Sequence, residues 1–371
     1  MKAGILPCQA IHQMLKNGEI KAAQDISNTQ LQPASIDLRL GDFAYPVNTS
    51  FLPGHGITVL DKMRQIDENF ERYKIDIRNG AVLEKGRVYV IPLIESLALP
   101  HNVAGFANPK SSTGRLDILT RLIADGSTIF DQLDKGYSGQ LYIEVAPRSF
   151  SVVVKTGTRL NQLRFRHDNG GIEHSEWQKL LAESQIFHGT ETKIPLSEEA
   201  GMLRVTADLR GNSKEGEVIG YRAKKHASPV DLEKLSHDAA DFWETITARK
   251  HASLVLDPNE FYILMTREAV AIPPDYAAEM VAYDTRAGEF RVHYAGFFDP
   301  GFGWNPATGK AGSSRAVLEV RSHEVPFLLE HGQTVGWLRY ERMAERPEQI
   351  YGLGIKSNYQ GQSLKLAKQF G

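Results

Sequence analysis

Short segments in which apolar and polar residues alternate run through most of the first 165 residues. This is the pattern of β-strands with one solvated face. The clearest case lies within residues 30–41, where Ile36, Leu38 and Leu40 alternate with charged residues. Short strands at regular spacing with Gly and Pro turns favour an all-β sandwich or barrel. From residue 81 onward, strands are expected in the segments 82–93, 98–109, 139–147, 149–157 and 158–166.

Two segments have the spacing of helices instead. Residues 7–25 place apolar side chains on one face at helical spacing, which predicts a short N-terminal helix that ends at Asn17-Gly18. Residues 167–200 interrupt the strand pattern with a turn cluster, and then Trp177 and Leu180 follow at helical spacing. We expect a connecting helix there, in a linker that covers residues 171–200.

The second half of the chain repeats landmarks of the first half in the same order, and the offset between counterparts drifts slowly. The counterparts are Asp37 and Asp208, Tyr89 and Tyr262, Pro100 and Pro273, Glu144 and Glu319, and Gly157 and Gly332. An ordered set of this kind predicts a tandem of two similar β domains. We expect the first domain in residues 1–170 and its diverged repeat in residues 201–371.

Composition narrows the class of protein. The 371 residues are 42% apolar and 24% charged, which is typical of a soluble globular protein. A formal net charge of −2 gives no general basic field for nucleic acid. No apolar run approaches the ~18 residues needed to span a bilayer, and the N-terminus lacks a signal-peptide pattern. We therefore expect a cytoplasmic protein that binds neither nucleic acid nor a membrane.

A cluster of hydroxyl groups and cations interrupts the strand pattern near residue 111. Lys110, Ser111 and Ser112 are followed by Gly114 and Arg115, and the glycine lets backbone approach a ligand closely. Hydroxyls, backbone N–H groups and two positive charges in six residues suit a polyanion such as a triphosphate. A polar turn between two strands is the alternative interpretation. We refer to residues 110–115 as the serine motif.

The serine motif, the segment QLQPASIDLRLG (residues 30–41) and the tail SNYQGQ (residues 357–362) occur in a characteristic order. With a glutamate-bearing strand, they resemble the dCTP deaminases, the trimeric branch of the dUTPase-like superfamily. The resemblance covers the first 165 residues and returns at the tail. It implies a mainly β protein with two tandem dUTPase-like domains, each a distorted jelly roll or β-barrel. It also implies a homo-oligomer, either a trimer or a hexamer-like arrangement of domains.

The resemblance implies a catalytic carboxylate. Hydrolytic loss of the cytosine amine requires attack of water on C4 and protonation of N3, and one carboxylate can serve both steps. Glu144, in the strand LYIEVAP, is the first candidate, although a surface strand glutamate is the alternative. Arg115 would pair with Glu144 or polarise the attacked centre, and Ser111 would hold the water or the departing amine. Glu319 is the alternative base.

The same resemblance implies the substrate contacts. Lys110 and Ser112 would bind phosphate oxygens, and Gly114 would let the ligand come close. Asp134 matches the sugar-side aspartate of the family, and Tyr137 would lie against the deoxyribose. Magnesium is expected with the triphosphate. The tail would close over the phosphates through Lys356, Tyr359 and Gln362.

Cysteine usage bears on the mechanism. Cys8 is the only cysteine, so a multi-cysteine zinc site is excluded. Zinc-dependent nucleobase deaminases need an H-x-E segment and P-C-x-x-C. His174-Ser175-Glu176 fits the first, but Pro7-Cys8 is a fragment of the second. Deamination by this chain is therefore expected to proceed without zinc.

The two copies have diverged in the motifs that the family shares. In the second copy, Asp284 takes the place of Ser111 and Gly288 that of Arg115, so the serine motif is lost there. The second copy does keep AGFFDPGFG (residues 295–303), close to the AGxIDPGxSG segment of the family, whereas the first copy departs from it.

Two arrangements of the site follow from this divergence. Three chains could pair Ser111 with Glu144 of a neighbour, in a ring of first copies. Alternatively, first and second copies could share a site that joins Ser111 and Arg115 to Glu319 and Asp299. Two domains per chain cannot alternate around a three-membered ring of equivalent positions, so symmetry favours Glu144.

The main expectation is a zinc-independent enzyme that converts dCTP to dUTP and ammonia for dUMP and dTTP biosynthesis. A dUTPase and a bifunctional enzyme that runs both steps are close alternatives, although the tail lacks the glycine-rich fifth motif of dUTPases. A non-catalytic regulatory protein that binds nucleotides is a more distant alternative. The sequence leaves open whether dTTP is an effector.

Overall fold

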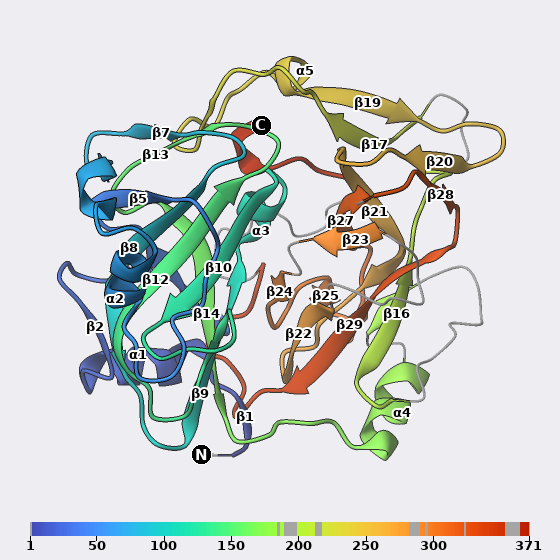
Figure 1. The fold of residues 1–371 in the computed structure, drawn as a ribbon. Helices are drawn as coiled ribbons and strands as arrows, with labels where there is room; N and C mark the ends of the chain where they lie inside the picture. Colours follow the sequence, from blue (N-terminus) through green and yellow to red (C-terminus); the bar gives the residue numbers. More distant parts are fainter. Residues whose placement is uncertain are drawn as a thin grey trace.

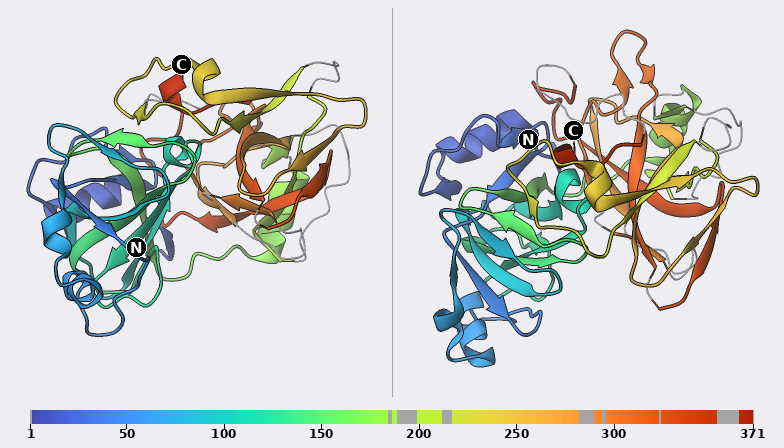
Figure 2. Two further views of the ribbon diagram at one scale, coloured as in Figure 1. Left: turned by 45° about the horizontal axis from the view of Figure 1, so that its top comes forward. Right: turned by 90° about the horizontal axis from the view of Figure 1, so that it is seen from above.

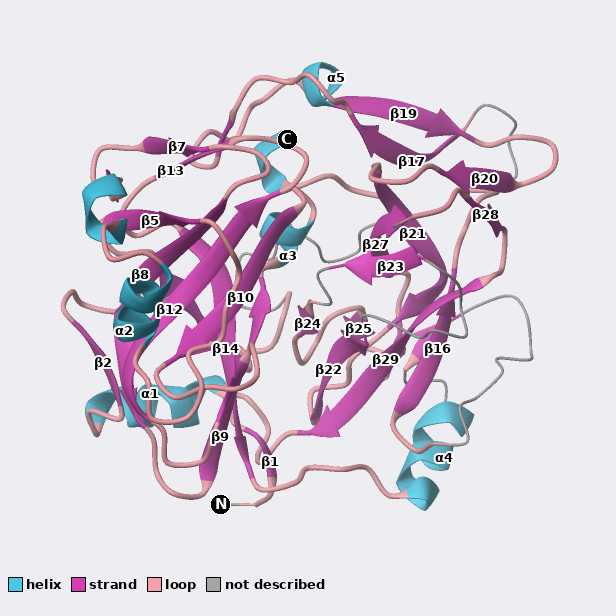
Figure 3. Ribbon diagram, in the orientation of Figure 1, coloured by secondary structure: helices cyan, strands magenta, loops and turns pink. Residues whose placement is uncertain are grey.

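The computed structural model describes residues 2–183, 186–188, 199–211, 217–281, 290–293, 296–322, 324–352 and 364–370. Strands dominate, and the helices are short; α1, α2 and α4 lie on the outside of the two β domains, whereas α3 lies between them (Figures 1 and 3). In this part of the chain, no helix is long and apolar enough to cross a membrane.

The first domain packs two six-stranded sheets against each other. One has the order β11-β9-β14-β4-β3 with β1 beside β14, and the other has the order β10-β12-β8-β5-β6 with β2 beside β8. Its elements are β1 (Gly4–Ile5), α1 (Cys8–Lys16), β2 (Ile20–Ala22), β3 (Leu31–Gln32), β4 (Ser35–Arg39), β5 (Phe43–Val47), α2 (Val59–Ile66), η1 (Phe70–Tyr73), β6 (Ile75–Asp76), β7 (Ala81–Leu83), β8 (Val88–Ala98), β9 (Val103–Pro109), α3 (Ser111–Gly114), β10 (Ile118–Ala124), β11 (Gln132–Leu133), β12 (Ser138–Pro147), β13 (Val152–Val154) and β14 (Arg159–His167).

The second domain repeats this plan. Its main sheets have the orders β19-β17-β21-β27-β23, with β15 beside β21, and β16-β29-β22-β24. Its elements are α4 (His174–Ala182), β15 (Phe187–His188), β16 (Met202–Thr206), β17 (Val218–Ala223), β18 (Val230–Asp231), α5 (Ala239–Phe242), β19 (Trp243–Thr247), β20 (Ser253–Leu256), β21 (Phe261–Val270), β22 (Tyr276–Val281), β23 (Phe290–His293), β24 (Phe297–Phe298), β25 (Trp304–Asn305), β26 (Lys310–Ala311), β27 (Arg315–Ser322), β28 (Phe327–Glu330), β29 (Thr334–Arg342) and η2 (Lys368–Phe370).

Strand pairing confirms the expected tandem of β domains. In the first domain β12 lies between β8 and β10, and in the second domain β27 lies between β21 and β23. Likewise β14 lies between β4 and β9, as β29 lies between β16 and β22. Glu144 and Glu319 therefore occupy equivalent central strands.

The two expected helices are present. The N-terminal helix ends where it was predicted to end, because Gly18 with φ of 70° turns the chain just after Lys16. Ile11 and Met14 of this helix are buried against the first domain. The connecting helix is α4, and its Trp177 packs in the core of the second domain.

The second half of the chain also reaches back onto the first domain (Figure 2). Strand β18 pairs in parallel with β13, with Val230 opposite Val152. Near the C-terminus, Phe370 stacks with Phe242 and Trp243, and both of those rings contact Phe150 of the first domain. One continuous apolar core therefore holds the two domains together.

Candidate functional site

The serine motif forms a single helical turn between β9 and β10. Lys110 is extended at the start of this turn, and its carbonyl accepts hydrogen bonds from the backbone N–H groups of Thr113 and Gly114. Its own N–H donates to the carbonyl of Leu160 on β14, which fixes the turn to the sheet. Ser112, Thr113, Gly114 and Arg115 are buried, while Ser111 is partly exposed.

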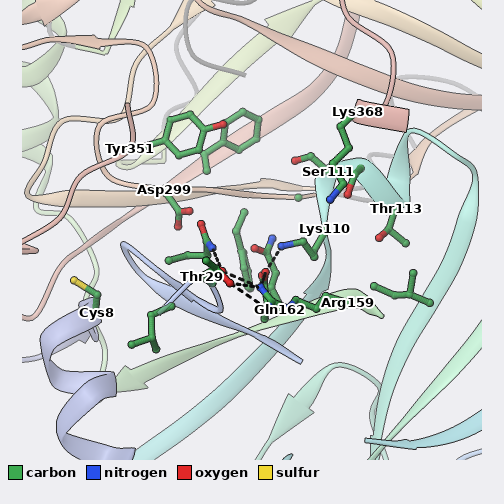
Figure 4. A pocket seen from close by; sticks show the side chains of 18 of the residues that line it. Cys8, Thr29, Lys110, Ser111, Thr113, Arg159, Gln162, Asp299, Tyr351 and Lys368 are labelled. Atoms are coloured by element: carbon green, nitrogen blue, oxygen red, sulfur yellow. Dashed lines mark hydrogen bonds and ion pairs between the residues drawn. The ribbon is translucent and has the colours of Figure 1, made fainter. Parts of the chain in front are cut away.

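A cavity of about 1160 Å³ lies between the two domains, next to this turn. From the first domain, Lys110, Ser111 and Arg115 line it. From the second half of the chain, Asp299 and Glu319 line it. Figure 4 shows Lys110 and Ser111 on one side of the cavity and Asp299 across from them. The structure thus joins, within one chain, the four residues of the mixed arrangement.

Glu319 reaches the cavity because of strand periodicity. In β27, Leu318 and Val320 point into the core of the second domain, so Val317 and Glu319 point the other way, toward the first domain. The Nε of Arg115 lies 3.9 Å from Oε1 of Glu319. Burial raises the pKa of Glu319 to about 8, and the positive charge of Arg115 opposes part of that rise. A carboxyl group with such a pKa can gain and lose a proton near neutral pH.

Arg115 is itself held by the C-terminal segment. Its Nη1 donates to the backbone carbonyls of Lys365, at 2.9 Å, and Leu366, at 3.4 Å. Leu366 is buried in the shared core, so the last residues of the chain fix this guanidinium beside Glu319. No sequence motif predicts this contact, because it is made by backbone carbonyls.

Asp299 follows β24 and is buried at the cavity wall. Burial raises the pKa of Asp299 to about 6, and the positive charge of Arg164 opposes the rise. The Nη2 of Arg164, in the first domain, lies 3.5 Å from Oδ1 of Asp299. The same guanidinium stacks on the ring of Phe297 at 4.0 Å. A residue of the first copy therefore orients an acidic group of the second.

Cations gather at one end of the cavity. Lys110 forms an ion pair with the buried Asp37, and Nη1 of Arg159 lies 3.8 Å from the same carboxylate. Lys368, from η2, also lines the cavity (Figure 4). Burial lowers the pKa of Lys368, and the charge of Lys110 lowers it further. Such crowded positive charge favours a bound anion.

Several members of this end were not singled out from the sequence as substrate contacts. These residues are Arg159, Lys368 and Tyr351. Gln162, opposite Asp37 in the β4–β14 ladder, also lines the cavity.

The surroundings of Glu144 differ from the expectation. Glu144 is 1% exposed, and its Oε1 accepts from Nε of Arg121 at 3.0 Å. On its face of β12, Tyr142 packs under Val59 and Met63 of α2. Glu144 does not line the cavity. The expected pairing of Arg115 with Glu144 is therefore absent from the described part of this chain, because α2 covers that face and Arg115 turns to Glu319.

Two further expected contacts lie elsewhere. Asp134 is exposed, and the hydroxyl of Tyr137 donates to the carbonyl of Gln140 at 2.7 Å. Neither residue lines the cavity, whereas Asp299 of the second copy does. The physical reason is the location of the AG-x-x-DPG segment, which the second copy keeps and the first has lost.

Ser112 and Gly114 are the other predicted substrate contacts of the serine motif. Ser112 lines the cavity, and Gly114 is buried at the end of α3. The predicted tail contacts Lys356, Tyr359 and Gln362, and the substituted positions Asp284 and Gly288, lie outside the described residues.

The fragments of the zinc motif have other partners. His174 is 2.9 Å from Nε2 of Gln178, and Glu176 pairs with Arg342 through Nε at 2.8 Å. Cys8, the first residue of α1, is buried and lines the cavity on the side away from Lys110 and Ser111 (Figure 4). Over the described ranges, no group of three or more His, Cys, Asp or Glu side chains is placed to hold a metal ion.

Together these features define a class of site. A buried carboxyl group that can exchange a proton near neutral pH lies across a cavity from a hydroxyl-bearing turn and beside a cluster of cations. Such a site combines anion binding with general acid–base chemistry.

Comparison with known proteins gives the family. Residues 2–169 match the model of the 2'-deoxycytidine 5'-triphosphate deaminase (DCD) N-terminal domain, and residues 173–370 match the corresponding C-terminal domain. The chain belongs to the dCTP deaminase family, as the sequence motifs predicted. A crystal structure of 2'-deoxycytidine 5'-triphosphate deaminase from Agrobacterium tumefaciens is 50% identical, covers 94% of this chain and all of its own, and superposes with a TM-score of 0.85.

Curated relatives are more distant and match about the length of one domain. The dUMP-forming dCTP deaminase of Methanobrevibacter smithii is 29% identical over 161 residues, which cover 43% of this chain and 75% of that protein. The corresponding protein of Pseudarthrobacter chlorophenolicus is 31% identical over 153 residues, which cover 39% of this chain and 75% of that protein. The enzyme class, a hydrolytic dCTP deaminase, is thereby confirmed.

Proposed function

We propose that this enzyme hydrolyses dCTP to dUTP and ammonia without zinc, at the site shared by its two domains. The observation that carries the proposal is the placement of Glu319. This carboxyl group has a pKa raised to about 8 and lies 3.9 Å from Arg115, in the cavity that the serine motif lines.

In this mechanism Glu319 is the single acid–base group. Its carboxylate takes a proton from the water that attacks C4 of cytosine, and the resulting carboxylic acid delivers that proton to N3. Collapse of the tetrahedral intermediate breaks the C4–N bond, and the amine leaves as ammonia after it takes up the hydroxyl proton through Glu319. Arg115 favours the carboxylate form that starts the cycle.

The other cavity residues bind and orient the substrate. Ser111 holds the attacking water or the departing amine. Lys110, Arg159 and Lys368 neutralise the triphosphate, and magnesium enters as part of the nucleotide. Asp299 accepts a hydrogen bond from the sugar, and its buried ion pair with Arg164 fixes its orientation.

A second candidate is release of dUMP instead of dUTP. The names of the curated relatives favour it, since those proteins are dUMP-forming. It would need a further water attack on the α-phosphate, with pyrophosphate as the leaving group. The dUTPase alternative would start from dUTP and release no ammonia, and the regulatory alternative would bind dCTP without turnover.

One incubation separates these candidates. Purified enzyme is given dCTP with magnesium after dialysis against a strong zinc chelator, and ammonia, dUTP, dUMP and pyrophosphate are measured over time. The proposal predicts ammonia and dUTP in equal amounts. Equal amounts of ammonia, dUMP and pyrophosphate would establish the second candidate. Absence of ammonia, or activity that only zinc restores, would contradict both.

A further inference from the structure

A second ion pair joins the domains directly behind the Arg115–Glu319 pair. Two residues beyond Arg115, Asp117 lies fully buried, and two residues beyond Glu319, Arg321 is buried as well. The Nη2 of Arg321 donates to Oδ2 of Asp117. The two ion pairs therefore have opposite polarity across the interface. Arg115 of the first domain pairs with Glu319 of the second, and Asp117 of the first pairs with Arg321 of the second.

The Asp117–Arg321 pair is fixed on both sides. In the first domain the hydroxyl of Ser149 donates to Oδ2 of Asp117 at 2.5 Å, and Nη2 of Arg321 lies 3.3 Å from that hydroxyl. In the second domain Nη1 of Arg321 donates to the carbonyl of Asn259 at 2.5 Å. A planar guanidinium held at several points keeps one orientation, so Arg321 fixes the position of the two domains relative to each other at this point.

The backbone of Asp117 has an unusual conformation at this contact. Asp117 adopts a φ of 56°, an uncommon conformation for a residue with a side chain. Its N–H donates to the carbonyl of Gly114, so the turn that carries Arg115 continues directly into Asp117. On β27, Arg321 and Glu319 share one face, because they are two residues apart. Any shift of Arg321 along the interface therefore moves Glu319 relative to Arg115.

We infer that the Asp117–Arg321 pair is the positioning device that sets Arg115 against Glu319 during deamination. The inference rests on the proposed function. Neither Asp117 nor Arg321 lines the cavity, so both act through the Arg115–Glu319 pair and not on the nucleotide. Among the described side chains, Arg115 is the charged group that faces Glu319 from the first domain, while Ile263 lies opposite Glu319 on β21.

The positioning role predicts a specific change in kinetics. Arg321→Met leaves Asp117 buried without its partner and can impair folding, so the double variant Asp117→Asn/Arg321→Met is the main test. With the pair gone, Arg115 and Glu319 separate. We expect kcat to fall about 100-fold while KM for dCTP changes less than about threefold, because the phosphate contacts lie elsewhere.

The pH profile separates positioning from a purely structural role. Arg115 lowers the pKa of Glu319, so their separation shifts the rising limb of the kcat profile to higher pH. A loss of folded enzyme would lower activity at every pH without moving that limb. Arg321→Lys keeps the charge but not the fork of donors, and we expect it to restore part of kcat.

A matched control is the ion pair between Arg166 and Glu341. It also joins the two domains, with Nη1 of Arg166 2.8 Å from Oε1 of Glu341, and neither residue lines the cavity. Arg166→Met/Glu341→Gln should lower thermal stability but keep the wild-type kcat and pH limb.

The outcomes are distinguishable. If wild-type enzyme releases no ammonia from dCTP, the proposed function fails. If wild-type enzyme is active and the folded Asp117→Asn/Arg321→Met variant keeps kcat within about threefold and an unmoved pH limb, only the positioning role is overturned. An equal shift of the limb in the control variant would also overturn it.

Discussion

Glu144 and Glu319 occupy the same place in two copies of one fold, yet only one of them meets the serine motif. Each lies on a central strand, opposite Val90 of β8 in the first domain and opposite Ile263 of β21 in the second. Both side chains point away from the core of their own domain. What differs is the layer that covers that outer face.

In the first domain, the segment that follows β5 folds back as α2 and covers Glu144. Its carboxylate then pairs with Arg121, whose guanidinium stacks on Phe130 at 4.2 Å. In the second domain, the segment that follows β17 reaches away and pairs through β18 with β13 of the first domain. The outer face of β27 is left for the first domain to cover. The comparison teaches that the segment covering the outer face of the central strand decides which carboxylate meets the serine motif.

The largest effect is expected at Glu319 itself. Glu319→Gln should lower kcat by about 1,000-fold or more while dCTP binding stays within about tenfold, because the amide cannot carry the proton. Glu144→Gln is the matched control and should retain most of kcat. Steady-state kinetics and calorimetric binding of dCTP to both variants check this. Near wild-type turnover by Glu319→Gln would remove it from the role.

Much of the fold was accessible from the sequence for a physical reason. Strand periodicity and the order of repeated landmarks are local properties, and they gave the tandem of β domains. The choice between Glu144 and Glu319 is not local. It depends on whether α2 covers a strand face, and residues 48–80 carry no clear pattern. Symmetry favours Glu144 only for a site between neighbouring chains, whereas the two domains of one chain enclose this cavity.

The site was predicted where a motif carried it. Ser111 and Arg115 lie in the cavity because the serine motif is a compact turn with a fixed geometry. Lys368 and Arg159 were not predicted as contacts, and the folded chain brings them to the cavity. Tyr137 was assigned by resemblance in a segment where the first copy departs from the family pattern.

A smaller effect is expected at Arg115 and Arg121, which pair with Glu319 and Glu144 respectively. Arg115→Met should lower kcat by about 100-fold and move the rising limb of the pH profile upward, because the charge that lowers the pKa of Glu319 is removed. Arg121→Met, which leaves Glu144 without its partner, should lower the melting temperature and leave the limb in place. If the rising limb of the pH profile moved in both variants, the different roles of Arg115 and Arg121 would be contradicted.

A change of about tenfold is expected at the cationic end of the cavity. Lys368→Met should raise KM for dCTP about tenfold with little change in kcat, since it removes a phosphate contact that is uniform along the reaction. Lys135, an exposed lysine paired with Asp168, provides the control, and Lys135→Met should leave KM unchanged. The difference should shrink at high salt.

Stability gives the smallest effect, with a sign that the pKa determines. Burial raises the pKa of Glu319 from 4.5 to about 8, so the folded state binds this proton more tightly than the unfolded state. The contribution of Glu319 to stability is therefore greatest below pH 4.5 and is lost as pH rises through about 8. Thermal unfolding of Glu319→Gln should show a gain over wild type at pH 8.5 that disappears below pH 4.5. A gain that is largest at low pH would contradict the raised pKa.

The proposed mechanism requires that one chain supplies both halves of its site, Ser111 and Glu319. Ser111→Ala and Glu319→Gln, which disable opposite halves, are co-expressed with two different tags and purified over both. Sites built within a chain stay inactive in the mixed oligomer, and kcat remains at the level of either variant alone. Sites built between chains would reunite Ser111 with Glu319, and recovery of about a quarter or more of wild-type activity in the mixed oligomer would contradict the account.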